Sequence, residues 1–152
     1  MFKKLLIIGG IYTMFFLFRK AQNRTDEQVD YMARTIWGEA RGEGARGMQA
    51  VANVIMNRVN KGGWYGATIK DVVLKKWQFS VWNEGDPNRD KILNATQAQL
   101  AQALDISKKV IKGELQDITG GATNYHATSV KPSWAAKMTK TVQIGNHVFY
   151  RE

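Results

Sequence analysis

Apolar residues recur at helical spacing in two consecutive stretches of the chain. The first stretch follows Thr25 and fades near Gly42, and the second covers residues 45–59 and stops at Gly62 and Gly63. Apolar residues three or four positions apart predict amphipathic helices, and Thr25 has the side chain and the spacing of a helix N-cap. The residues expected on the two buried faces are Val29, Met32, Ala33, Ile36, Trp37, Ala40, Met48, Val51, Ala52, Ile55 and Val59.

The pattern changes along the rest of the chain. Thr68 and Thr96 are expected to cap two further helices, with an irregular stretch at residues 77–95 between them. Towards the C-terminus, β-branched and aromatic residues flank Gly145 and Asn146, which is typical of a two-residue hairpin. The sequence therefore predicts an α+β fold with a mostly helical lobe, a small C-terminal antiparallel sheet and a cleft between them.

The first 20 residues differ from the remainder. An apolar run of about 14 residues, 5–18, lies between two basic pairs and is shorter than the roughly 20 residues of an untilted membrane-spanning helix. It matches a signal-peptide core, but no small-residue cleavage site follows, which favours an uncleaved signal anchor. A cleaved signal and an interfacial helix are the alternatives. We expect residues 1–20 to attach to the bacterial inner membrane, residues 21–25 to form a linker and residues 26–152 to be an exported catalytic domain.

Composition narrows the choice of chemistry. The chain carries a net charge of +9, has two histidines and no cysteine, and contains no glycine-rich phosphate loop. Neither a metal nor another cofactor is expected. A basic surface can serve nucleic acid, anionic lipid or an acidic polymer such as peptidoglycan. The basic residues are scattered and match no nucleic-acid-binding module, so nucleic acid is not an expected partner.

Glu39 is the strongest candidate for catalysis. On a helical projection it lies about 80° from the centre of the first apolar stripe, near the last turn. Partial burial and the negative end of a helix both favour the protonated carboxyl form, which a general acid needs near neutral pH. The alternative is a solvated carboxylate paired with Arg41 or Arg46.

Cleavage of a glycosidic bond by water normally needs a second carboxylate. Glu43 and Asp86 are the first candidates, followed by Glu84 and Asp90, and none of them stands out. A lytic transglycosylase can act with one glutamate, because a hydroxyl group of the sugar itself attacks. The pattern favours that mechanism over a muramidase that uses water.

Aromatic and hydrogen-bonding residues in the later half of the chain are candidates for binding sugars. Aromatic faces stack on the apolar faces of sugar rings, and amide, hydroxyl and imidazole groups bond to their polar substituents. The candidates are Gln78, Phe79, Ser80, Trp82, Tyr125, His126 and Trp134.

Four ordered segments resemble the SleB/CwlJ-type cell-wall hydrolases. They are WGEARGEGARGMQAVANVIMNRV (37–59), QFSVW (78–82), GGATNYHATSVKPSWA (120–135) and IGNHVFYR (144–151), and the resemblance covers about residues 27–151. It implies a lysozyme-like fold, action on peptidoglycan glycan strands and a catalytic role for Glu39.

The architecture also suggests a more specific hypothesis. A small basic domain behind an anchor-like segment resembles a phage endolysin that is exported and then released at lysis. A non-catalytic wall-binding module is the rival from another functional class.

Overall fold

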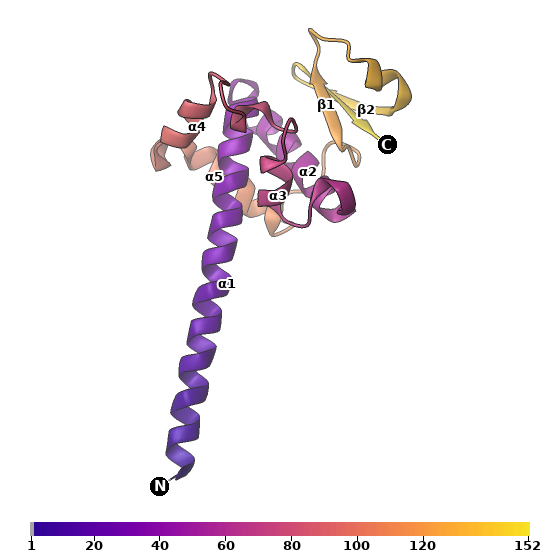
Figure 1. Cartoon of the computed structure of the whole chain (residues 1–152). Coiled ribbons are helices and arrows are strands. Elements are labelled where there is room, and N and C mark those ends of the chain that lie inside the picture. The colour runs from indigo at the N-terminus through magenta and orange to yellow at the C-terminus, as the bar shows by residue number, and fades with distance from the viewer. Residues whose placement is uncertain (1) are drawn as a thin grey trace.

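The longest element is a single helix, α1 (Phe2–Ala40), whose N-terminal half projects from the rest of the molecule (Figure 1). In this computed structural model the backbone is described for residues 2–152 and the side chains for residues 11–152. The predicted helix start at Thr25 is wrong, because its hydroxyl donates to the Ala21 carbonyl oxygen at 3.1 Å, inside the helix. Residues 21–25 are helical and form no irregular linker, while the division of the chain into segment and domain stays a prediction.

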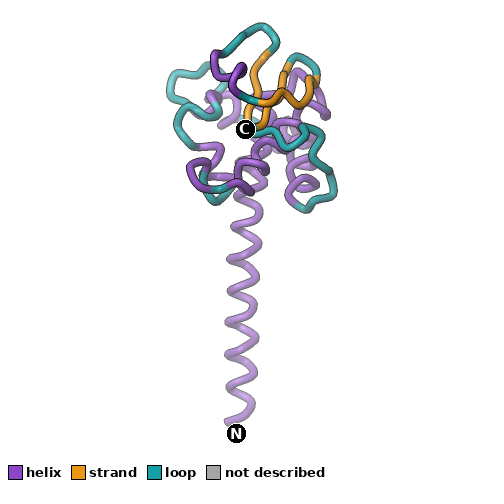
Figure 2. Tube along the Cα trace, turned by 90° about the vertical axis from the view of Figure 1, so that its right-hand side faces the viewer, coloured by secondary structure: helices purple, strands orange, loops and turns teal. Residues whose placement is uncertain are grey.

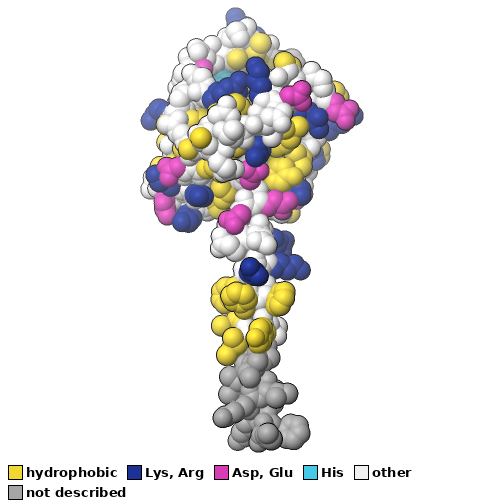
Figure 3. All heavy atoms as spheres, turned by 90° about the vertical axis from the view of Figure 1, so that its left-hand side faces the viewer, with side chains coloured by type: hydrophobic (Ala, Val, Ile, Leu, Met, Phe, Trp, Pro, Cys, Tyr) yellow, Lys and Arg dark blue, Asp and Glu magenta, His cyan; other side chains and the backbone are white. Residues whose placement is uncertain are grey.

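The projecting part of α1 exposes a run of apolar side chains from Ile11 to Phe18. Figure 3 shows these side chains on the stalk, with basic side chains between them and the globular part. The first half of the predicted apolar run, up to residue 10, lies outside the described side chains. Within the described residues, no helix combines the length and apolar character that crossing a membrane requires.

The C-terminal part of α1 lies in a helical lobe and packs against the other α-helices of that lobe. These are α2 (Gly44–Lys61), α3 (Ile69–Leu74), α4 (Arg89–Asn94) and α5 (Gln97–Ile111). Short 3-10 helices lie at η1 (Arg41–Glu43), η2 (Gly63–Tyr65), η3 (Ser80–Trp82) and η4 (Ser133–Lys137).

Helix capping explains several of these boundaries. Thr68 and Thr96 each accept a backbone N–H three residues later, and the side chain of that later residue bonds back to the backbone of the cap. Both predicted caps are confirmed. The stretch at residues 77–95 was expected to be irregular, but it contains η3 and α4.

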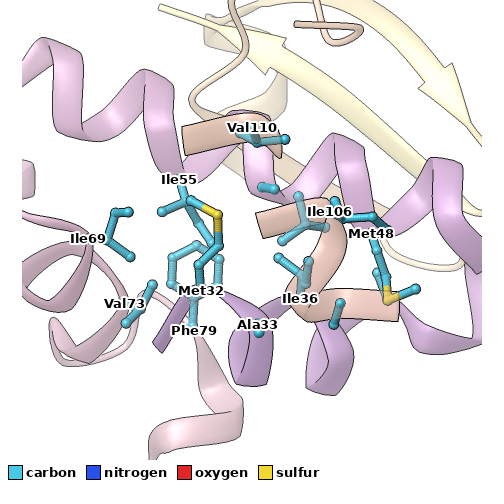
Figure 4. Packing of buried hydrophobic residues seen from close by; sticks show 14 of the residues in the cluster. Met32, Ala33, Ile36, Met48, Ile55, Ile69, Val73, Phe79, Ile106 and Val110 are labelled. Atoms are coloured by element: carbon cyan, nitrogen blue, oxygen red, sulfur yellow. The ribbon is translucent and has the colours of Figure 1, made fainter. Parts of the chain in front are cut away.

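The main core lies between α1, α2, α3 and α5 (Figure 4). Met32, Ile36 and Ile55 are fully buried there, as their helical spacing predicts. Gly38 lets α1 approach η3 and α4, because a Cβ at this position would stand 2.8 Å from Ile92 Cγ2 and 3.0 Å from Val81 Cγ1.

The sheet lies at one end of the helical lobe (Figures 1 and 2). Its strands are β1 (Asn124–Ala127), β2 (Thr139–Ile144) and β3 (His147–Arg151), antiparallel in the order β1-β3-β2. Gly145 takes a positive φ of 55° in the predicted hairpin turn. Tyr125 pairs with Phe149, which packs with Ala50 and Val54 of α2 and so fixes the sheet on the helices.

Candidate active site

Glu39 lies in the last turn of α1, where the helix meets the sheet. The Tyr125 hydroxyl of β1 donates to Glu39 Oε2 at 2.9 Å. Glu39 Oε1 is buried and has no partner at hydrogen-bonding geometry among the described residues. The carboxyl group is therefore shielded on one side and held in place from the sheet on the other, and it does not form the solvated pair with Arg41 or Arg46.

The surroundings favour a protonated Glu39. Burial raises the pKa of its carboxyl group, and the negative charge of Asp86 acts in the same direction. The Tyr125 hydroxyl, the Val81 backbone amide and the Arg58 guanidinium lower this pKa, but burial outweighs them. A raised pKa favours the protonated carboxyl group, which is the form that can deliver a proton to a leaving oxygen.

Tyr125 acts as a fixed donor to this carboxyl group. Burial and the neighbouring Glu39 raise the pKa of its hydroxyl well above the ordinary value, so the phenol stays protonated. Its ring stacks on Phe149 with the centroids 5.5 Å apart and meets His147 edge-on. Tyr125 was a candidate sugar ligand, and in the structure its hydroxyl is bonded to the Glu39 carboxyl group.

Arg58 is a component of the site that the sequence did not reveal. It comes from α2, is only 5% exposed, and donates from Nε to the Thr123 carbonyl oxygen at 2.7 Å. Its guanidinium carbon lies 5.1 Å from the centroid of the Phe79 ring and 5.4 Å from that of Tyr65. Arg58 follows Ile55 by three positions and Val51 by seven, so helical spacing places it on the buried face of the helix. This spacing is the signal in the sequence that could have indicated a buried arginine.

The candidates for a second carboxylate have different surroundings. Glu43 accepts hydrogen bonds from the backbone and side chain of Asn146, at 3.0 and 3.1 Å, and these bonds lower its pKa. Glu43 therefore holds the β2–β3 turn against η1. Asp86 lies near enough to influence the charge of Glu39, and its Oδ1 accepts the Asn88 backbone amide at 2.8 Å. Glu84 and Asp90 are exposed.

Residues 78–82 contribute to the site unequally. Phe79 is 1% exposed in the main core, so its predicted contact with sugar is wrong. Gln78 lines a hollow of the surface, and Ser80 is exposed. Trp82 is half-buried and donates from Nε1 to Thr35 Oγ1 at 2.9 Å. The other residues lining the hollow are Lys61, Gly62, Gly63, Trp64, Tyr65, Asn124 and Glu152.

His126 and Trp134 belong to an aromatic group on the sheet. The His126 ring stacks on Tyr150 with the centroids 5.3 Å apart, and Trp134 meets both rings edge-on. His126 Nε2 lies 3.0 Å from the Tyr150 hydroxyl. All three rings are half-buried, so they offer partial faces to a ligand while supporting one another. In the part of the chain that the structure describes, no three acidic or histidine side chains converge as metal ligands.

Comparisons with known proteins give the site its context. The chain is 30% identical over 126 residues to a spore cortex-lytic enzyme of Halalkalibacterium halodurans, covering 82% of this chain and 35% of that protein. A spore cortex-lytic enzyme of Oceanobacillus iheyensis is 29% identical over 136 residues, covering 84% of this chain and 43% of that protein. The chain thus spans less than half the length of these two curated relatives.

Two solved structures are similar over most of the chain. The catalytic domain of the germination-specific lytic transglycosylase SleB from Bacillus anthracis matches with a TM-score of 0.63 and 28% identity, covering 82% of this chain and 93% of that domain. The catalytic domain of the Bacillus cereus SleB protein matches with a TM-score of 0.63 and 25% identity, covering 83% and 91%. The predicted mostly helical fold with a small sheet is confirmed. The cell wall hydrolase family model matches residues 42–150, beginning just after Glu39, and the chain therefore belongs to this family.

Proposed function

We propose that this protein cleaves the bond between N-acetylmuramic acid and N-acetylglucosamine in peptidoglycan, as a lytic transglycosylase with Glu39 as its acid. The observation that carries the proposal is the half-buried Glu39 carboxyl group, whose pKa is raised and which Tyr125 holds at the junction of helix and sheet. Family membership and the similarity to a SleB catalytic domain support peptidoglycan as the substrate.

The proton balance of this reaction needs one acid group. Glu39 gives its proton to the glycosidic oxygen as the bond from that oxygen to the muramyl C1 breaks. The Glu39 carboxylate then takes the proton of the muramyl 6-hydroxyl while the oxygen of that hydroxyl bonds to C1. The products are a 1,6-anhydromuramyl end and a free hydroxyl on N-acetylglucosamine, and Glu39 is protonated again.

The positions of the other carboxylates favour this route over hydrolysis. Glu43 is bonded to Asn146 in the hairpin turn and is not directed at a substrate. Asp86 is the remaining carboxylate near Glu39, so it is the group that would activate water if the enzyme were instead a muramidase.

Mass spectrometry of digested peptidoglycan separates the two reactions. We expect the purified protein to release muropeptides with anhydro ends, which are lighter by one water than the products of hydrolysis. Products with reducing muramic acid would assign the muramidase reaction. No release of muropeptides at all would contradict glycan cleavage.

We further propose that the projecting half of α1 attaches the enzyme to a bacterial membrane after export, as in a phage endolysin that is released at lysis. Apolar side chains from Ile11 to Phe18 surround the helix on all sides, which suits lipid better than a single protein groove. Arg19, Lys20 and Arg24 follow them and would face anionic headgroups. Expression with and without residues 1–20, followed by fractionation and a lysis assay, tests this. Membrane association and lysis that are independent of the segment would contradict it.

A further inference from the structure

Arg58 holds a positive charge inside the protein with few polar partners. Its Nε bonds to the Thr123 carbonyl oxygen, whereas its Nη1 is buried with no hydrogen-bond partner among the described residues. Arg58 takes part in none of the ion pairs found among the described residues. Burial of a guanidinium without a close carboxylate is unfavourable, and burial lowers the pKa of Arg58. A structural role at the Thr123 carbonyl alone would not require a charge.

The charge of Arg58 acts on the groups of the active site. It interacts electrostatically with Glu39, Tyr125, Tyr65 and Glu152. The rings of Phe79 and Tyr65 lie against its guanidinium and keep it in place. Tyr65, whose ring lies against the Arg58 guanidinium, and Glu152, which also interacts with Arg58, line the surface hollow.

The proposed reaction makes two opposite demands on Glu39. Its carboxyl group must first be protonated, which burial and Asp86 favour. Once the proton has left, the same buried group must exist as a carboxylate long enough to accept another. The groups that favour the carboxylate are the Tyr125 hydroxyl on β1, the Val81 amide in η3 and Arg58 on α2, and only Arg58 carries a full positive charge.

We propose that Arg58 is a positioning residue for the reaction, whose buried charge stabilises the Glu39 carboxylate formed after proton donation. This inference rests on the function proposed above. It accounts for a buried guanidinium that is held by two aromatic rings and one carbonyl oxygen and whose Nη1 lacks a hydrogen-bond partner among the described residues. The consequence is that the charge of Arg58, beyond its packing, contributes to how easily Glu39 gives up its proton, after the larger effects of burial, Tyr125, Val81 and Asp86.

Neutral and charged substitutions separate the charge from the packing. Arg58→Met removes both the charge and the hydrogen bond, Arg58→Gln removes the charge but keeps an N–H donor for Thr123, and Arg58→Lys keeps the charge. Arg46→Met on the exposed face of the same helix is the matched control. We expect both neutral variants to lower kcat on peptidoglycan about tenfold with little change in KM, because they weaken the acid–base step. The lysine variant and the control should stay close to the native rate.

The pH dependence provides the readout that packing alone would not change. Loss of the positive charge should raise the pKa of Glu39 further, so the alkaline limb of the kcat profile moves to higher pH in the neutral variants and stays in place in Arg58→Lys. The same titration of the Glu39 carboxyl group can be followed by NMR without substrate, so it remains informative even if the protein does not cleave glycans. Thermal melting identifies any variant that is unfolded. If Arg58→Met is unfolded, the comparison of Arg58→Gln with Arg58→Lys still shows whether the charge of residue 58 changes the Glu39 titration. An unchanged Glu39 titration in a folded neutral variant would overturn the proposal.

Discussion

Replacement of Glu39 by glutamine is expected to reduce peptidoglycan cleavage about a thousandfold while leaving the fold intact. Loss of a positioned general acid removes a contribution of about 10² to 10⁴ to the rate. Glutamine has nearly the same shape, and its carbonyl oxygen can still accept the Tyr125 hydroxyl that now bonds to Oε2 at 2.9 Å. The neutral amide matches the protonated carboxyl group that we propose for native Glu39, so the melting temperature should not fall.

Release of soluble muropeptides from purified cell walls measures this loss. Glu43→Gln is the matched control, because it makes the same chemical change four residues later on a side chain bonded to the hairpin turn. We expect the control to keep most of the native rate. Equal losses in both variants would show that two carboxylates take part, and an active Glu39→Gln protein would remove Glu39 from the mechanism.

Replacement of Phe79 by alanine is expected to lower the free energy of unfolding by about 3–5 kcal/mol. The ring is 1% exposed, belongs to the main core, and lies against the Arg58 guanidinium. Its removal leaves a cavity between α1, α2 and the loop before η3, and takes away one face that holds Arg58. Denaturant unfolding followed by fluorescence or circular dichroism measures the change.

Trp77→Ala is the control for this substitution. Trp77 is a larger aromatic residue two positions earlier, but it is 74% exposed, so its loss should change stability by only about 0.5 kcal/mol. If Phe79→Ala unfolded at the same denaturant concentration as the native protein, the ring would not be a core residue. Its predicted role as a sugar contact would then have to be reconsidered.

Local patterns in the sequence were sufficient for most elements of the globular part. The helix at residues 44–61 follows from the spacing of Val51, Ala52 and Ile55, and it ends at the two glycines that were expected to stop it. Threonine caps and the Gly145–Asn146 turn were equally readable, because each depends on residues only a few positions apart. Glu39 was a candidate because its position relative to the apolar stripe places it at the edge of the buried face, and the resemblance to cell-wall hydrolases strengthened that prediction.

Features that depend on distant contacts could not be read in the same way. Thr25 and Gln28 have the spacing of a capping box, but α1 continues unbroken through this position. The backbone groups there already have partners within the helix, so no helix begins at Thr25. Phe79 lies between the polar residues Gln78 and Ser80 in the chain, and only the tertiary structure places its ring in the core. The bond between Glu43 and Asn146 joins residues 103 positions apart, and no spacing rule indicates it.

The protonation of Glu39 in the native protein is the most direct test of the catalytic site. NMR with ¹³C-labelled glutamate, with Glu39→Gln used to assign the signal, follows this carboxyl group across the pH range. The titration should lie above that of an ordinary glutamate, because burial opposes the charged form, and cleavage should fall as the pH rises through the same transition. A Glu39 that titrates like an exposed glutamate, with activity that persists well above that pH, would contradict its role as the general acid.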